Sequence, residues 1–249
     1  MTARQVLEHV WLVGSGTDRD AFTDRHDCHC YLVWDGTSGF LIDAGTGLGA
    51  DRWLQNIREV CDPTRLEAVL LTHYHADHAG GAAMARAAGI DVRAHETTVD
   101  ALRHGDEERT QMRRAREAGI YPPEYRLRRS EATQLEVGGS VVSGDMSIKI
   151  IDAPGHCDGH LVFMTQLATG LLLFSGDCLF ADSRVSMQPI PDCHLDKYAA
   201  TVIRVAAYRP DALLPGHGDL VLSNAWETID RAADAFQRLI PPPNLMLPW

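Results

Sequence analysis

Short runs of apolar or alternating residues recur along the chain, separated by clusters of Gly, Asp and Ser. Runs of roughly four to eight such residues between turn signals predict β-strands. The Asp35-Gly36-Thr37-Ser38 segment between two of them predicts a hairpin. The expected strands are Val6–Val13, Cys30–Trp34, Gly39–Asp43, Leu66–Thr72, Asp91–Ala94, Ser140–Ser143, Ser147–Asp152, Leu161–Gln166, Leu171–Ser175 and Ala212–Pro215.

Longer segments with helical spacing of apolar residues lie between these strands. Helices are expected at about Asp51–Val60, Ala79–Gly89, Leu195–Ala207 and Trp226–Leu239. Residues 96–130 are highly charged and mostly helical in pattern, and the Pro122-Pro123 pair interrupts them. We interpret this segment as a helical insertion that leaves the sheet and returns.

The order of elements predicts an α/β (α+β) fold. Two β-rich halves, each followed by helices, suit two mixed sheets packed face to face with helices outside, an αββα four-layer sandwich. No linker is visible, and 249 residues can bury a full core, so residues 1–249 are expected to form one domain. The proline-rich tail from Pro241 cannot start as a helix, and its Leu and Trp residues predict packing on the body or on a neighbour.

Composition narrows the function classes. The formal net charge of −11 disfavours nucleic acid, whose phosphate backbone requires positive surface. No apolar run approaches the roughly 20 residues that span a bilayer, and the N-terminus has no secretory pattern, which predicts a cytoplasmic enzyme that contacts no membrane. The expected partner is a small-molecule substrate, and a homodimer is left open. The six cysteines form no CxxC pair, and Cys28 and Cys30 are expected to be buried apolar residues.

Three histidines and an aspartate occur within six residues, at His73, His75, Asp77 and His78. In an extended chain residues i and i+2 point the same way, so His73 and His75 can reach one ion. Asp77 and His78 lie where the chain turns into a helix and can serve a second ion. Tyr74, between the first pair, points away and is expected in the core.

Three later ligand-type residues each follow an apolar run and a glycine: His156, Asp177 and His217. Glycine allows a tight turn and a close approach of the backbone to a metal. A third histidine completes the three-imidazole set with an open position that is typical of catalytic zinc. The expected ligands are His73, His75 and His156 for the first ion, Asp77, His78 and His217 for the second, and Asp177 as the bridge.

The motif His73-x-His75-x-Asp77-His78, with Gly155-His156, Gly176-Asp177 and Gly216-His217-Gly218 in that order, resembles the metallo-β-lactamase superfamily. The resemblance covers about residues 28–220. It implies the αββα sandwich with the site at one rim of the sheets, and it implies the same seven ligands in the same roles.

Within that superfamily the sequence resembles the glyoxalase II and lactonase branches. The β-lactamases lack a bridging aspartate at the position of Asp177. The stretches 173–180 and 155–160 are similar to glyoxalase II, but the 32 residues after His217 are expected to be too few for the basic C-terminal helical domain of that branch. The insertion at 96–130 is more like lactonases, whose active-site tyrosine is not visible after Asp177; Tyr198 is a distant candidate.

These residues predict a dinuclear hydrolase that cleaves a carbonyl ester, lactone or thioester with a metal-bridging hydroxide. Metal charge lowers the pKa of bound water to about 7 and stabilises the oxyanion, and Asp77 is expected to orient the nucleophile and carry its proton. The mixed N/O ligands suit two divalent ions, with Zn²⁺ first and Fe or Mn as alternatives. The rival functions are a mononuclear iron persulfide dioxygenase, a nuclease or phosphodiesterase, and a non-catalytic metal-stabilised scaffold.

Other polar residues are interpreted as structural. His160 is expected to support the site rather than bind metal, and Cys157 and Cys178 are expected to pack. His26, His29 and His194 are weak candidates for the mouth of the site. The arginines of the insertion are interpreted as a solvated helix face. The loops at 14–27, 96–130 and 180–194 are expected to form the pocket walls.

Overall fold

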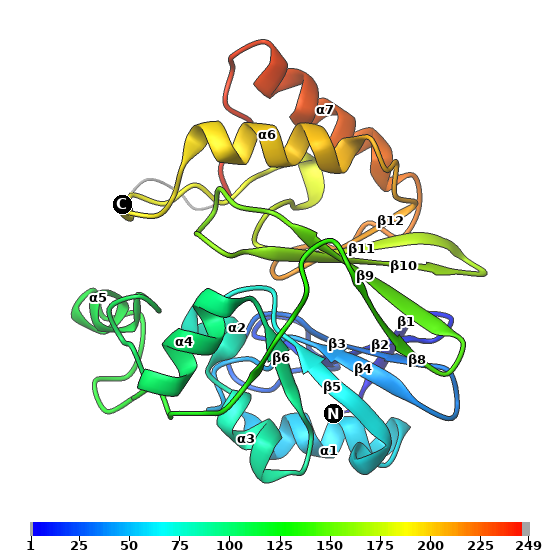
Figure 1. Cartoon of the computed structure of the whole chain (residues 1–249), viewed down its shortest axis with the longest axis vertical. Helices are drawn as coiled ribbons and strands as arrows, with labels where there is room; N and C mark the ends of the chain where they lie inside the picture. The colour runs from blue at the N-terminus through cyan, green and yellow to red at the C-terminus, as the bar shows by residue number, and fades with distance from the viewer. Residues whose placement is uncertain (1, 246–249) are drawn as a thin grey trace. The chain divides into compact units, whose positions relative to one another are not determined.

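The computed structural model describes residues 2–245, which form two compact units (Figure 1). The first unit groups residues 2–135 with 142–146, and the second groups residues 136–141 with 147–245. A seven-stranded sheet and a five-stranded sheet account for the strands of the described residues. The expected single domain over residues 1–249 stays a prediction.

The sheet of the first unit follows the order of its strands along the chain, from β1 to β7. The first four strands pair antiparallel, and the later pairs are parallel. The predicted hairpin at Asp35 is confirmed, and its carboxylate accepts hydrogen bonds from the amides of Thr37 and Ser38. The strands are β1 (Arg4–Leu7), β2 (Val10–Gly14), β3 (Cys30–Trp34), β4 (Gly39–Ile42), β5 (Leu66–Leu70), β6 (Val92–Ala94) and β7 (Thr133–Gln134).

Helices of the first unit pack their apolar stripes on this sheet (Figure 1). Trp53 and Ile57, one turn apart, are both buried in its core. Full burial of a side chain of this kind contributes about 1.5–3 kcal/mol, so this face fixes the helix on the sheet. The helices are α1 (Ala50–Val60), α2 (Ala76–Ala79), α3 (Ala82–Ala87), α4 (Glu96–His104) and α5 (Met112–Glu117).

The second unit has the strand order β12-β11-β10-β9-β8. Strands β9, β10 and β11 are antiparallel, and β12 joins β11 in parallel. Helices α6 (Leu195–Ala206) and α7 (Ala225–Gln237) bury Val202, Ile229 and Phe236 in one core on the same face of the sheet (Figure 1). The strands are β8 (Ser140–Ser143), β9 (Met146–Asp152), β10 (Leu161–Leu167), β11 (Gly170–Gly176) and β12 (Ala212–Pro215).

Three expected elements differ from the structure. The strand expected at Val6–Val13 is two strands, because the chain turns at His9, which has a φ of 64°. The helix expected at Ala79–Gly89 is the shorter α3, because consecutive glycines, Gly80 and Gly81, separate it from α2. The insertion at 96–130 contains α4 and α5, but its last part has no regular secondary structure.

The described part of the tail packs on its own unit. The amide of Val185 donates to the carbonyl of Pro243, and the amide of Leu245 donates back to the carbonyl of Val185. The expected packing of the tail on the body is confirmed for this stretch. The Trp of the prediction, Trp249, lies outside the described residues.

Candidate metal centre

The first ligand cluster lies on a continuous piece of chain at the end of β5. His73 and His75 follow the strand in extended chain, and His75 caps α2, which carries Asp77 and His78. The ring centroids of His73 and His75 are 4.6 Å apart, and those of His73 and His78 are 4.1 Å apart. The structure therefore brings the three imidazoles of this segment together.

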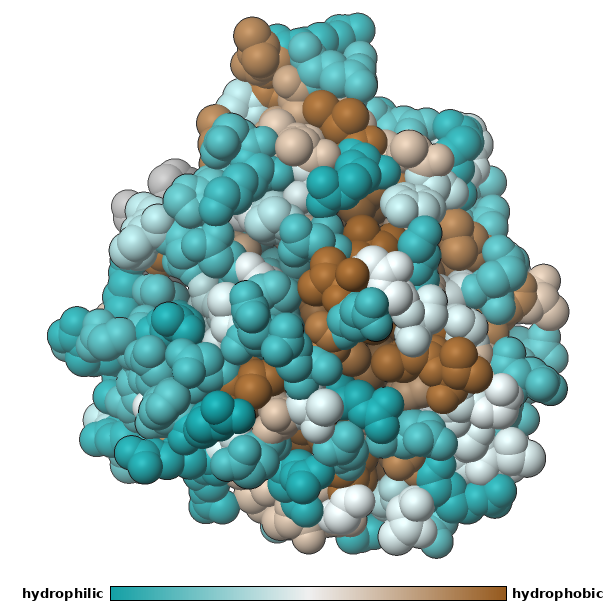
Figure 2. Space-filling model, in the orientation of Figure 1, coloured by the Kyte–Doolittle hydropathy of each residue, from teal (hydrophilic) through white to brown (hydrophobic). Residues whose placement is uncertain are grey.

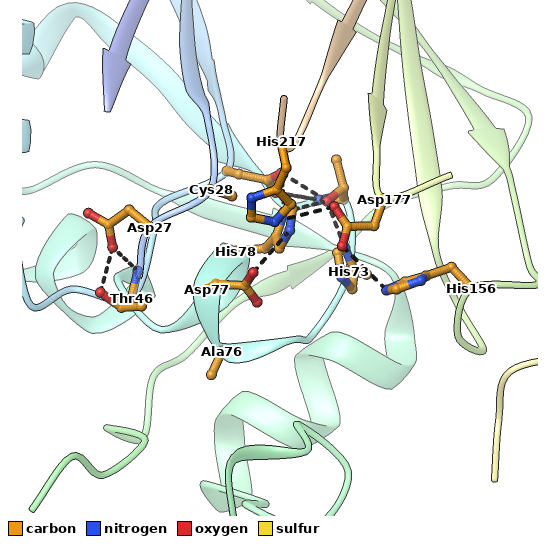
Figure 3. A network of polar contacts seen from close by, with 12 residues as sticks. Asp27, Cys28, Thr46, His73, Ala76, Asp77, His78, His156, Asp177 and His217 are labelled. Carbon is orange, nitrogen blue, oxygen red and sulfur yellow. Dashed lines mark hydrogen bonds and ion pairs between the residues drawn. The ribbon is translucent and has the colours of Figure 1, made fainter. Parts of the chain in front are cut away.

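Asp43, at the end of the neighbouring strand β4, supports this cluster from behind. Its carboxylate accepts a 2.7 Å hydrogen bond from the amide of Thr72 and lies 2.8 Å from Nδ1 of His78. His78 itself is seen beside Asp77 in Figure 3. A carboxylate on Nδ1 fixes the proton there and leaves Nε2 with the lone pair that a metal requires. Nδ1 of His73 is likewise 3.0 Å from the hydroxyl of Thr72.

Asp43 was missed in the sequence. Its contacts to Thr72 and His78 depend on the parallel pairing of β4 with β5, which brings residues far apart in the chain side by side. The one local signal is an aspartate in a strand-to-glycine turn, and Asp43 has a φ of 60°, a left-handed conformation that Asp tolerates better than most residues.

Cys28 lies beside Asp43 and His78, and one ligand atom from each of the three falls within 4.8 Å of the others. Burial raises the pKa of the Cys28 thiol well above its ordinary value, which favours the neutral thiol over the thiolate. Cys28 and Cys30 are 0% and 1% exposed, which confirms that both are buried.

The second ligand cluster is assembled from three separate turns of the second unit. His156 follows β9, Asp177 follows β11, and His217 follows β12. The turn before His156 requires glycine: Gly155 has a φ of 140°, and a Cβ there would lie 2.4 Å from Cα of Tyr198.

Asp177 lies between the two histidines of this cluster. Its Oδ2 is 3.6 Å from Nε2 of His156, and its Oδ1 is 3.6 Å from Nε2 of His217 (Figure 3). Two ligands on one tetrahedral zinc, each roughly 2.0–2.1 Å from the ion, are about 3.3 Å apart. The distance from Oδ2 to His156 is therefore short enough for both atoms to bind one ion. The same holds for Oδ1 and His217.

The backbone of Asp177 is held on both sides. Its amide donates to Nε2 of His160 at 3.2 Å, and its carbonyl accepts from the hydroxyl of Tyr198 at 2.8 Å. His160 thus supports the site, as expected. Tyr198 is fully buried, and its hydroxyl also contacts the carbonyl of Cys178 and the amide of Ser186, so it positions this turn.

His156 also has its ring oriented by the chain. Its Nδ1 lies 2.7 Å from the carbonyl of Ser186, which places the proton on Nδ1 and leaves Nε2 facing Asp177. This is the arrangement in which protein ligands present an imidazole to a metal. The donor sets of both clusters fit divalent metal ions such as zinc, since they combine imidazoles with carboxylates.

The remaining candidates lie in buried or hydrogen-bonded positions. Tyr74, Cys157 and Cys178 are buried, as expected. His29 is buried, with Nδ1 3.0 Å from the hydroxyl of Ser15, and Nδ1 of His26 lies 2.7 Å from the carboxylate of Asp24. Among residues 2–245, no helix has both the length and the apolar character needed to cross a bilayer.

Comparison with known proteins gives one family. Residues 23–217 match the family described as "Metallo-beta-lactamase superfamily", and this span includes all seven candidate ligands. The match covers most of the chain and both units.

Curated relatives are similar at low identity. The "Thioesterase pkgB" of Emericella nidulans is 26% identical over 81% of this chain and 48% of its own length. A "Hydroxyacylglutathione hydrolase" of Aeromonas salmonicida is 27% identical over 86% of this chain and 66% of its own length. The "Probable metallo-hydrolase YybB" of Bacillus subtilis is 25% identical over 90% of this chain and 94% of its own. The chain thus spans about half to two thirds of the first two relatives.

Solved structures show the same fold. A metallo-β-lactamase of Cronobacter sakazakii with a HARLDQ motif superposes with a TM-score of 0.71 at 17% identity, covering 96% of this chain and 97% of that one. At this identity the likeness concerns the fold alone. It confirms the expected fold class, the αββα architecture of mixed sheets with helices.

Proposed function

The chain belongs to the metallo-β-lactamase superfamily, and from that membership we propose that it is a metal-dependent hydrolase of carbonyl esters, thioesters or lactones. The relatives named as a thioesterase and a hydroxyacylglutathione hydrolase support hydrolysis, and thioesters are the substrates that these names favour. The substrate is a small molecule, and the proposed location is the cytoplasm.

The observation that carries the proposal is the position of Asp177. Its two oxygens face two different imidazoles at equal distances, which supports a carboxylate that joins two ions rather than one that completes a single site. The proposed ligands are His73, His75 and His156 for the first ion and Asp77, His78 and His217 for the second, with Asp177 between them. Zinc is the first choice, and iron or manganese would be accepted by the same donors.

When bound, such ions supply activated water for attack on the carbonyl carbon and positive charge for the developing oxyanion. The residues of the chain hold and orient this chemistry. Asp43 and the carbonyl of Ser186 accept hydrogen bonds from Nδ1 of His78 and His156, which orients each ring so that Nε2 is the nitrogen presented to a metal. Asp77, whose Oδ2 lies 3.7 Å from Nε2 of His78, accepts the proton of the attacking water and passes it to the leaving group.

The proposal is tested with a matched panel of ester, thioester and lactone substrates and with metal analysis. Chelation should abolish turnover, and added zinc should restore it. His75→Gln should lower both bound metal and kcat/KM by about 10³-fold or more, whereas the exposed imidazole change His104→Gln should alter neither.

Three results would overturn the proposal. One iron per chain with oxygen uptake on a persulfide substrate would favour the dioxygenase, and cleavage of phosphodiesters alone would favour the nuclease. Metal binding without turnover on any member of the panel would favour the scaffold.

A further inference from the structure

The first unit contains a cavity of about 300 Å³ that none of the seven candidate ligands lines. Its walls come from the turn before α1, from the start of the α2–α3 connection, and from the last part of the insertion. Gly80, which lines it, directly follows α2, the helix that carries Asp77 and His78. The cavity therefore adjoins the segment that bears the first ligand cluster.

Two arginines of the insertion line this cavity from one side. From Tyr125 to Arg128 the chain alternates between buried and exposed residues: Tyr125 and Leu127 are each 7% exposed, whereas Arg126 and Arg128 are exposed. In extended chain, residues two apart point the same way and lie about 6.5–7 Å from one another. The two guanidinium groups therefore belong to one face of the segment.

The segment is fixed in place, although it has no regular secondary structure. The hydroxyl of Tyr125 donates to the carbonyl of Thr46 at 2.6 Å, and Arg116 donates to the carbonyl of Tyr125 at 3.0 Å. The amide of Leu127 donates to Glu107 at 3.3 Å. Such anchoring lowers the entropy that the two arginines would lose when they bind a ligand.

The hydrogen bonds of these arginines go to uncharged groups. Nη1 of Arg126 donates to the carbonyls of Pro123 and Tyr125, and Nη1 of Arg128 contacts the sulfur of Met84. Within residues 2–245, neither guanidinium is within ion-pair distance of a carboxylate. By contrast, Arg113 pairs with Glu108 and Glu117 in the same insertion, where the surface over α4 and α5 is hydrophilic (Figure 2).

One acidic residue, Glu124, also lines the cavity. Two guanidinium groups and one carboxylate leave a local charge of about +1, in a chain whose net charge is −11. Arginines pair with carboxylate and phosphate in directional, charge-assisted hydrogen bonds, frequently through two nitrogens at once. A small anionic group thus suits the cavity both in charge and in hydrogen bonding.

We propose that this cavity binds a carboxylate or phosphate group at the non-reacting end of the substrate, held by Arg126 and Arg128. The proposal rests on the proposed function and deepens it, because it selects esters or thioesters with an anionic tail. The interpretation of the arginines as a solvated helix face does not hold for these two, which line a cavity and lie outside any helix.

The test compares thioesters of equal length whose thiol part ends in a neutral amide, a carboxylate or a phosphate. Wild-type protein should prefer at least one of the anionic substrates by about tenfold or more in kcat/KM, and the preferred arm identifies the natural group. The double variant Arg126→Gln/Arg128→Gln should lose this preference, and Glu124→Gln should increase it. Arg129→Gln, the same charge change at the adjacent exposed position, should keep it.

A binding measurement separates failure of this site from failure of the proposed function. Calorimetric titration with inorganic phosphate and with succinate should give weaker binding to the double variant than to wild type, with matching melting temperatures showing that both proteins are folded. If no ester, thioester or lactone is cleaved but this difference is found, the hydrolase proposal fails and the anion site holds. If neutral and anionic thioesters are cleaved alike, or if the double variant binds both anions as wild type does, the anion site is wrong.

Discussion

The two candidate ligand clusters are built in different ways. The first lies on six consecutive residues after one strand, and Asp43 and Thr72 support it from the sheet. The second draws His156, Asp177 and His217 from three turns separated by long stretches of chain. In the second cluster a single residue, Asp177, contacts both of the others.

The two clusters should therefore differ in how strongly a single mutation disturbs them. In the first, adjacent residues keep the imidazoles close even if one contact is lost, since the backbone itself links them. In the second, the relative positions of the two histidines depend on the Asp177 turn, which hydrogen bonds from His160 and Tyr198 hold in place. Changes at Asp177 should therefore have larger effects than changes at the support of the first cluster.

The largest effect is expected for Asp177→Asn. An amide cannot offer two anionic oxygens, so the variant should lose at least one of two bound metal equivalents and about 10³-fold in kcat/KM. Metal analysis and substrate kinetics measure both quantities. Asp196→Asn makes the same charge change at an exposed position of α6 and serves as the control. Full activity with two metals in Asp177→Asn would refute the bridging assignment.

A smaller effect is expected for Asp43→Asn. The asparagine tolerates the left-handed conformation and can still accept from the amide of Thr72, but it presents a neutral partner to Nδ1 of His78. Loss of such a partner typically weakens metal affinity about 10–100-fold. Competition with a chromophoric chelator measures the change, with Asp51→Asn, at the start of α1, as the control. An effect as large as that of Asp177→Asn would contradict the proposed difference between the clusters.

Tyr198→Phe should have a moderate effect on the second cluster. It removes one buried hydroxyl that contacts two carbonyls and one amide, which should destabilise the protein by about 1–3 kcal/mol. Because the carbonyl of Asp177 is one of these partners, metal affinity should also fall, by about tenfold. Urea unfolding and chelator competition test the two effects, and Tyr208→Phe at the surface provides the control. A loss of stability without any loss of metal affinity would mean that Tyr198 does not position Asp177.

The smallest effect concerns Glu107, which holds the arginine-bearing segment of the first unit. The hydrogen bond from Arg116 lowers the pKa of Glu107 below 4.5. The ionised Glu107 therefore stabilises the folded protein fully above pH 4.5, and this stabilisation is lost as the pH falls through the lowered pKa of the folded state. Glu107→Gln should speed hydrogen exchange of the Leu127 amide a few-fold at neutral pH, and the difference from wild type should shrink in acid. The amide of Ser130, bonded to the carbonyl of Leu102, should exchange alike in both proteins. Equal exchange at Leu127 in the two proteins would show that Glu107 does not hold this segment.

Much of the fold follows from local sequence. The strands Cys30–Trp34 and Ala212–Pro215 were predicted to the residue, because each is a short apolar run between turn signals. The first ligand cluster was equally visible, because its residues are adjacent and their spacing alone brings the imidazoles together. The division of the expected strand Val6–Val13 was not predicted, since a left-handed turn at His9 has no strong local signal.

What the sequence did not reveal depends on contacts between distant segments. Asp43 supports His78 only because β4 and β5 are neighbours, and Tyr198 reaches Asp177 only through the packing of α6 on its sheet. The insertion was expected to form a pocket wall, but Arg126 and Arg128 were not distinguished from its other arginines, because the segment was interpreted as helical, whereas this part has no regular secondary structure. Helical propensity competes weakly with tertiary anchors such as the contact between Tyr125 and Thr46.

The bridging role of Asp177 can be tested by anomalous diffraction from crystals of the metal-loaded protein, with data on both sides of the metal absorption edge. If Asp177 joins two ions, two peaks should lie on either side of its carboxylate, with Oδ2 and His156 at one ion and Oδ1 and His217 at the other. A single peak, or two peaks of which one lacks an oxygen of Asp177, would contradict the bridging role.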